Sequence, residues 1–312
     1  MNLNALRPRL KASGSVQKVP ARLIVNTLAY ASLLAALCPL GAHCATSAPN
    51  ASAKPGTVFK DCKDCPEMVV LPTGSFVMGT PDDEQGRQDD EGPMHSVTFT
   101  RPFAISRFQI LAGEWDAYIK DTGYKMPDGD KRPGRLCKAG KPSYPITARH
   151  PAVCMDLAEV NAYVDWLSKK TGKPYRLTSE SIREYAARAG STGPFPFPMD
   201  EGKEYSIAKH ANTYGASDGY NYTSPAGTFP PNAFGLYDMH GNVYEWVADC
   251  AHDNYVGAPT DGSPWLENDC KIQQIRGNDY GEAPIFSRSG NRNQLYPRVR
   301  GDWIGFRVVR DL

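Results

Sequence analysis

The sequence predicts a loop-rich α+β fold with a few short helices and strands, and its composition supports this. Of its 312 residues 41% are hydrophobic, which is enough apolar mass for a sizeable core. The 28 glycines and 26 prolines are scattered along the chain, so the regular elements must be short and separated by turns. Basic residues (35) and acidic residues (34) nearly balance and no basic run stands out, so no nucleic-acid partner is expected.

The first 45 residues predict an export signal peptide: basic residues precede an apolar stretch from Leu23 to Leu40, and small residues follow up to Ala45. An uncleaved membrane anchor is the alternative, but the stretch is short for a membrane span. Residues 46–60 begin with Ala, Ser and Pro and are expected to form a flexible tether, followed by a single domain over 61–312. We therefore expect a periplasmic or secreted protein that is soluble after cleavage, and a monomer.

Six cysteines follow the predicted signal, an even number in a chain bound for an oxidising compartment, so disulfides are expected. Six cysteines allow about 15 connectivities. Their grouping along the sequence favours Cys62–Cys65, Cys137–Cys154 and Cys250–Cys270. The Cys62-x-x-Cys65 spacing also occurs in redox motifs, but no strand and helix flank it as in a thioredoxin unit, which favours a structural disulfide.

Strand patterns begin the predicted domain. Residues 68–71 and 76–78 are apolar and are separated by Pro72-Thr73-Gly74, which predicts a β-hairpin. Val97, Phe99 and residues 103–105 continue the strand pattern, and together these segments predict a small sheet.

Three helices are predicted next. The first covers residues 111–120 and ends at Thr122-Gly123, and the second covers 156–169, begins with the capping pair Asp156 and Glu159, and ends at Gly172. The third is expected to be capped by Thr178 and to stop at Gly190. Beyond Gly190 the sequence shows almost no periodicity, so disulfides and bound metal are expected to hold this part.

Several motifs then occur in order along the chain. They are Met68-Val69-Val70-Leu71-Pro72-x-Gly74-x-Phe76-x-Met78-Gly79, Arg176-Leu177-Thr178, Glu184-Tyr185-Ala186-Ala187-Arg188, Asn232-x-Phe234-Gly235-Leu236-Tyr237-Asp238-Met239-x-Gly241-Asn242-Val243-x-Glu245-Trp246, Arg276-Gly277 and Gly305-Phe306-Arg307. Together they resemble the sulfatase-modifying-factor family, whose founding members are formylglycine-generating enzymes. The resemblance spans about residues 66–310 and implies one α+β domain of the modified C-type-lectin type, with little regular structure.

The resemblance implies two structural calcium sites. One is expected at Asp238 and Glu245 by side chain and at Gly241 and Val243 by carbonyl, and this all-oxygen set on an eight-residue turn is itself suited to calcium. The other maps to Asn212 and Asp218 by side chain and to Thr213 and Tyr220 by carbonyl. Without an ion, each segment would be an ordinary Asx-rich turn. His240, inside the first turn, is interpreted as a residue that caps the loop, with a metal-ligand role as the alternative.

The same resemblance argues against the chemistry of the founding members. Formylglycine-generating enzymes oxidise a cysteine of a sulfatase peptide with copper held by two active-site cysteines near the C-terminus. The corresponding segment here, residues 276–290, contains no cysteine, and thiolates are the ligands that select Cu(I). Copper is therefore not expected.

Glu282 lies almost where the first of those cysteines would be, and Tyr280, Phe286 and Trp303 are expected to form a pocket around it. A carboxyl among aromatic rings has a raised pKa and can exchange protons with a substrate, so Glu282 is the candidate catalytic residue. A solvated loop carboxylate is the alternative. The arginines of this region either hold an anionic substrate or pair with surface acids; they are Arg288, Arg292, Arg298 and Arg300.

Three functions are compatible with these features. The first is a divergent maturation oxidoreductase acting on a peptide or peptide-derived substrate, as the resemblance to the family's pyoverdine-maturation branch implies, since that branch oxidises without the cysteine pair. The second is a non-catalytic lectin-like module that binds a partner protein or a glycan. The third is a copper-dependent formylglycine-generating oxidase acting on sulfatases, which the missing cysteines oppose.

Overall fold

The computed structural model describes residues 53–129, 137–199 and 207–312, so the predicted signal peptide (1–45) lies outside the described residues. The helices are α1 (Ala112–Thr122), α2 (Leu157–Thr171) and α3 (Glu180–Arg188), with 3-10 turns at Asp89–Glu91, Ala216–Asp218 and Pro284–Ser287. The strands are β1 (Val58–Phe59), β2 (Met68–Leu71), β3 (Gly74–Met78), β4 (His95–Phe99), β5 (Phe103–Ser106), β6 (Cys137–Lys138), β7 (Lys141–Pro142), β8 (Tyr175–Leu177), β9 (Tyr244–Cys250), β10 (Gln273–Arg276), β11 (Asn293–Leu295), β12 (Ile304–Phe306) and β13 (Val308–Asp311). The predicted loop-rich α+β class is confirmed.

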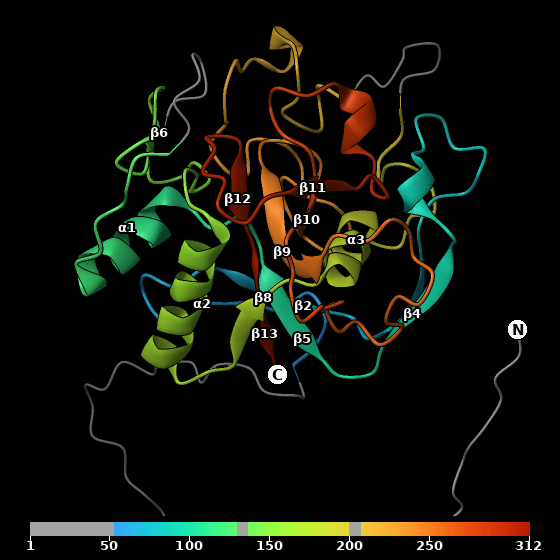
Figure 1. The fold of residues 1–312 in the computed structure, drawn as a ribbon, viewed down its shortest axis with the longest axis horizontal. Helices are drawn as coiled ribbons and strands as arrows, with labels where there is room; N and C mark the ends of the chain where they lie inside the picture. Colours follow the sequence, from blue (N-terminus) through green and yellow to red (C-terminus); the bar gives the residue numbers. More distant parts are fainter. Residues whose placement is uncertain (1–52, 130–136, 200–206) are drawn as a thin grey trace, which may run out of the picture. The chain divides into compact units, whose positions relative to one another are not determined.

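An antiparallel five-stranded sheet forms the centre of the domain, in the order β1-β2-β5-β13-β8. Alternate side chains of β2 enter two different cores, since successive residues of a strand point to opposite faces. Met68 and Val70 pack with residues of α1 and α2, whereas Val69 and Leu71 pack with residues of α3, β4 and β5. Figure 1 accordingly shows α1 and α2 on one side of the strands and α3 on the other.

The second sheet is built entirely from the part of the chain after Gly190. Its order is β11-β10-β9-β12, and β12 runs parallel to β9 while the other pairs are antiparallel. The expectation that regular structure is nearly absent here was therefore wrong. Strands β9 and β10 are buried on both faces, and such strands show no alternation of polar and apolar residues.

The predicted hairpin has the right strands but the wrong partners. All four residues of β2 are buried, and β2 pairs with β1 and β5 instead of β3. Strand β3 is largely exposed and pairs with β4. A strand buried on both faces is stabilised by a neighbour at each edge, and the positive φ of Gly74 (+136°) lets the chain turn away between β2 and β3.

The helix boundaries follow their capping residues. In α2 the Asp156 carboxylate accepts from the Glu159 amide at 3.0 Å and the Glu159 carboxylate accepts from the Asp156 amide at 2.9 Å, which is the predicted capping box. Gly123 and Gly172 end α1 and α2 in left-handed conformations. The cap of α3 is Ser179 and not Thr178, because the Ser179 hydroxyl accepts from the Ile182 amide at 3.2 Å.

The predicted tether (46–60) extends too far. Val58 and Phe59 form β1 and pair with Val69 and Met68, and Phe59 packs against the main core. An apolar ring that covers the core is more stable there than in water. The ordered domain therefore begins before residue 61.

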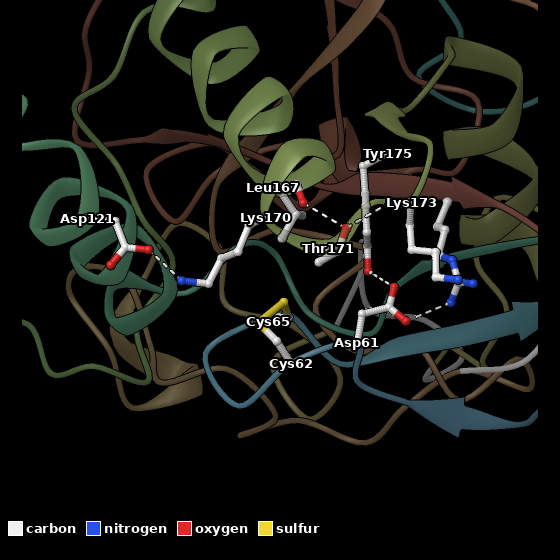
Figure 2. The surroundings of a disulfide bond; sticks show 10 residues. Asp61, Cys62, Cys65, Asp121, Leu167, Lys170, Thr171, Lys173 and Tyr175 are labelled. Atoms are coloured by element: carbon white, nitrogen blue, oxygen red, sulfur yellow. Dashed lines mark hydrogen bonds and ion pairs between the residues drawn. A yellow bond between two sulfur atoms is a disulfide. The ribbon is translucent and has the colours of Figure 1, made fainter. Parts of the chain in front are cut away.

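All three predicted disulfides are confirmed: Cys62–Cys65, Cys137–Cys154 and Cys250–Cys270. Figure 2 shows the first beside the C-terminal turn of α2. Next to it, Asp61 accepts from the Tyr175 hydroxyl at 2.6 Å and from the Arg310 guanidinium at 2.9 Å. These contacts tie the first strands to β8 and β13. Among the described residues, no helix is long and apolar enough to cross a membrane.

We predict that Glu114→Gln removes a pH-dependent loss of stability. Glu114 accepts from the Leu111 amide at 2.9 Å at the start of α1, and burial raises the pKa of its carboxyl to about 7. As the pH rises from the ordinary pKa of 4.5 to about 7, the unfolded chain loses this proton while the folded chain keeps it. The free energy of unfolding then falls by about 1 to 3 kcal/mol.

The glutamine still accepts from the Leu111 amide but does not titrate. Denaturant unfolding at about pH 4 and pH 8 should therefore show a larger decline for the wild type than for the variant. Equal declines in the two proteins would contradict the assignment.

Candidate functional site

Glu282 lies on the loop that leaves β10. Gly277 (φ +102°) and Asn278 (φ +69°) turn the chain out of the sheet, and the Tyr280 amide then donates to the Asn242 carbonyl at 3.1 Å. The Glu282 carbonyl accepts from the Tyr214 amide at 2.9 Å, which ties this loop to the second predicted calcium segment. The Glu282 side chain is partly exposed, so a ligand in solution can reach it.

The three rings expected around Glu282 have separate surroundings. Tyr280 is buried and lies edge-on to Tyr144 and Tyr222, at centroid distances of 6.0 and 5.9 Å. Trp303 packs edge-on against Tyr244 at 5.9 Å, and Phe286 is 37% exposed. Tyr280 is thus part of a tyrosine cluster, defined here as Tyr144, Tyr222 and Tyr280.

The tyrosine cluster borders a cavity of about 400 Å³, which Tyr144 lines. Its walls come from α1, from Met126 and from residues 139–153. They include Trp115, Ile119, Pro142 and Ile146, with Asp116 and Lys141 as charged groups. The Tyr144 hydroxyl donates to the Asp302 carbonyl at 2.7 Å, and burial holds the pKa of this phenol well above its ordinary value. The cavity therefore has both apolar and polar walls, and Tyr144 connects it to Tyr280 on the loop of Glu282.

Most of the arginines near Glu282 are already paired. Arg288 contacts Glu91 at 2.6 Å, Arg292 contacts Glu180 at 2.7 Å, and all four side chains are buried. Arg300 pairs with Asp156 and Glu159 at 2.5 and 2.9 Å. These three arginines therefore pair with acids, which was one of the two roles expected for them. The acids, however, are mostly buried and do not lie on the surface.

The segment from Asn212 to Tyr220 fits a calcium ion in part. Asn212 is 1% exposed, and within the described residues no donor reaches its Oδ1 atom. The two oxygens of Asp218 accept from the Thr213 and Tyr220 amides, each at 2.8 Å, and thus bring the carboxylate to the residues expected to supply carbonyl ligands. Amide and carboxylate oxygens are both ligands that calcium accepts.

The turn from Asp238 to Glu245 does not fit calcium. Glu245 is fully buried and its two oxygens accept from Arg183 at 2.6 and 3.2 Å, from Arg307 at 3.0 Å and from Gln109 at 3.0 Å. Burial raises the pKa of this carboxyl, but the two guanidiniums lower it by more. The pKa of Glu245 therefore lies below its ordinary value. Val243 and Gly241 contribute to the same closed turn through an amide-to-carbonyl bond of 2.9 Å. The Glu245 carboxylate and the Gly241 carbonyl are thus already bonded to nitrogen donors, and the Asp238 carboxylate accepts from the Gly227 amide at 3.0 Å.

His240 connects this turn to the loop after Glu282. Its Nδ1 atom lies 2.7 Å from the Ser287 carbonyl, and its ring lies edge-on to Phe195 and Phe197. Burial lowers the pKa of His240 to about 4, so the ring is neutral at pH 7. The loop-capping interpretation fits this environment. Among the described residues, no cluster of three His, Cys, Asp or Glu side chains is placed to hold a metal.

Sequence reasoning missed the buried ionic groups that hold these loops. Arg276 contacts Glu180 at 3.1 Å and Glu184 at 2.6 Å, and Glu184 also accepts from the Gly79 amide at 2.9 Å. Every residue of α3 is buried, although the helix carries four charged side chains. Its charged residues Glu180, Arg183, Glu184 and Arg188 recur at helical spacing and form one face. Such a face is normally solvated, so the helix pattern carried no signal of their burial.

We predict that Arg276→Lys destabilises the domain by about 2 to 4 kcal/mol, because a lysine cannot reach both carboxylates and leaves a buried charge incompletely paired. The matched control is Arg176→Lys, at a pair with Asp311 whose side chains are 36% and 52% exposed. We expect that change to cost less than about 1 kcal/mol. Denaturant unfolding of both variants gives the comparison, and equal losses would contradict the role assigned to Arg276.

The chain is similar to proteins of one family. Residues 54–312 match the family model of the sulfatase-modifying factor enzyme 1-like domain. The formylglycine-generating enzyme of Streptomyces coelicolor is 28% identical over 321 aligned positions, covering 86% of this chain and 96% of that protein. That of Thermomonospora curvata is 30% identical over 222 positions, covering 58% of this chain and 71% of that protein. The solved structure of PvdO from Pseudomonas aeruginosa is 74% identical, with a TM-score of 0.82, and the match covers 84% of this chain and 100% of that one.

Proposed function

The chain belongs to the sulfatase-modifying factor family, and from this premise we propose that it is a divergent maturation factor. In this proposal it is an oxidoreductase that acts on a peptide or a peptide-derived substrate without copper–cysteine chemistry. The identity to PvdO is high along the whole of that chain, and this supports an activity shared with PvdO. The lower identity to formylglycine-generating enzymes is weaker support for formylglycine formation.

The state of the cysteines carries this proposal. All six cysteines of the described residues are joined in disulfides, and none lies between Arg276 and Leu312. A disulfide sulfur is not a thiolate, and thiolates are what hold Cu(I) and act as nucleophiles. The loop in the region of the family's copper site instead carries the partly exposed Glu282, and Tyr280 of the same loop packs in the tyrosine cluster.

The substrate is assigned to the cavity between α1 and residues 139–153. Its apolar walls suit a side chain or ring of a peptide-derived molecule, and Asp116 and Lys141 can bind the peptide's polar groups. The proposed reaction removes two hydrogens from the substrate and transfers them to dioxygen, which leaves as hydrogen peroxide. Glu282, on the loop whose Tyr280 contacts Tyr144 of the cavity wall, would accept one of the two protons and pass it to the reduced dioxygen.

Calcium is proposed as a structural ion at the segment from Asn212 to Tyr220. Asn212 Oδ1 and the Asp218 carboxylate would hold it, with the Thr213 and Tyr220 carbonyls. When bound, the ion supplies positive charge that fixes this turn. Because the Tyr214 amide binds the Glu282 carbonyl, the ion would also steady the loop of Glu282 without touching the substrate.

An exported location is proposed from the disulfides, since structural disulfides form in oxidising compartments such as the periplasm or the exterior. The predicted signal peptide supports the same location. We propose a monomer that meets its substrate there.

We predict that Glu282→Gln lowers turnover by at least about tenfold and leaves folding intact, because an amide cannot accept the proton. The probe is the reduced peptide precursor of a pyoverdine-type siderophore. Oxygen uptake and mass-spectrometric loss of two hydrogens report turnover, and circular dichroism reports folding. Asp83→Asn, at another exposed acid, is the control and should retain full turnover.

Unchanged turnover in Glu282→Gln would remove Glu282 from the mechanism while leaving the oxidoreductase assignment intact. If the wild type binds the precursor but converts none of it, the lectin-like binding module becomes the better function.

We also predict that the wild-type protein, purified without added metal and then supplied with Cu(I), does not convert a Cys-x-Pro-x-Arg peptide. Elemental analysis should find no stoichiometric copper, because no cysteine thiolate is available in the described residues. Loss of the peptide thiol with formation of an aldehyde would restore the formylglycine-generating function.

A further inference from the structure

We infer that the turn from Asp238 to Glu245 is closed by the chain's own cations and binds no calcium, so that calcium is confined to the segment from Asn212 to Tyr220. This inference departs from the two-ion expectation for the family, and it holds whether or not the protein is an enzyme.

The two guanidiniums supply the charge that an ion would bring. Arg183 comes from α3 and Arg307 from the connection between β12 and β13, and both contact the Glu245 carboxylate. Together they carry two positive charges, as one calcium ion does. A further divalent cation would add charge where the carboxylate is already neutralised.

The Gln109 amide contacts two of the expected ligands, the Gly241 carbonyl and the Glu245 carboxylate. Its Nε2 atom lies 2.9 Å from the Asp238 carbonyl, 3.4 Å from the Gly241 carbonyl and 3.0 Å from Glu245 Oε1. Calcium binds oxygens at about 2.3 to 2.6 Å, so an ion coordinated by these three atoms would have to replace this nitrogen. Gln109 is fully buried, and its three neighbours are all acceptors, which fixes the NH₂ group on their side.

The guanidiniums also bind the other carbonyls of the turn. Arg183 donates to the Met239 carbonyl at 2.8 Å, and Arg307 donates to the Asp238 carbonyl at 3.2 Å and to the Tyr237 carbonyl. Hydrogen bonds from charged donors are the stronger class. The turn is thus satisfied by three side chains that belong to distant parts of the sequence.

The segment from Asn212 to Tyr220 differs in two respects. Asn212 Oδ1 has no donor among the described residues, whereas Glu245 has four donor contacts. Asp218 is partly exposed, so an ion can enter from solvent, while Glu245 is 0% exposed. The two sites predicted as equivalent from the sequence are therefore chemically different.

The test is the calcium stoichiometry of the full chain. The protein is stripped with a chelator, equilibrated with calcium and measured by elemental mass spectrometry and calorimetric titration. We expect one ion per wild-type chain, none in Asp218→Asn, and one in the matched control Asp253→Asn, which alters another exposed acid. Chelation should lower the thermal midpoint of the wild type and the control but leave that of Asp218→Asn unchanged.

Two ions per wild-type chain, or one ion retained in a folded Asp218→Asn, would overturn the inference. No ion in the wild type would overturn the assignment to Asn212 and Asp218. If Asp218→Asn fails to fold, the wild-type count still decides, because two ions require the turn from Asp238 to Glu245 to take one.

Discussion

The buried ion pairs of α3 are the interaction on which the rest of the structure depends. All nine residues of this helix are buried, and its acids receive arginines from three places: Arg188 in the helix itself, Arg276 at the end of β10 and Arg292 near β11. Taking a charge out of water costs several kcal/mol, so each group is tolerated only while its partner is in place. The helix is therefore a framework to which the loops after Gly190 are bound by charge.

This arrangement explains how long loops hold a defined site. Arg276 binds Glu184 of α3 and so positions the end of β10, where the loop of Glu282 begins. Arg183 of α3 binds Glu245 and closes the turn that contains His240. His240 in turn contacts the Ser287 carbonyl beyond Glu282. Contacts of charged side chains inside the domain thus hold these loops in place, as backbone hydrogen bonds hold the strands of a sheet.

The proposed function uses the family scaffold with a different reactive group. The region that holds copper in formylglycine-generating enzymes has no cysteine here, and the six cysteines of the described residues serve as three disulfides. The loop there carries the Glu282 carboxyl, and its Tyr280 packs against Tyr144, which lines the cavity. In the proposed reaction, proton transfer at this carboxyl accompanies oxidation of a bound substrate by dioxygen.

Local sequence alone determined the three helices, the capping box of α2, the glycine stops of α1 and α2, and the disulfides. Capping residues and glycine stops act within a few residues, so Asp156, Glu159, Gly123 and Gly172 mark helix ends before any tertiary contact forms. Each disulfide joins two cysteines that follow one another along the chain. The family motifs also identified the fold and the absence of a copper-binding cysteine pair.

Tertiary structure decided the partners of strands and charges. The pairing of β2 with β5 and the sheet formed by β9 and β10 depend on burial of both faces, which leaves no alternation in the sequence. The contrast between Glu245 and Asp218 arises because Gln109, Arg183 and Arg307 converge on one carboxylate from distant segments. The sequence motif specifies the oxygens of a turn, but only the fold decides whether nitrogen donors or an ion fill the space between them.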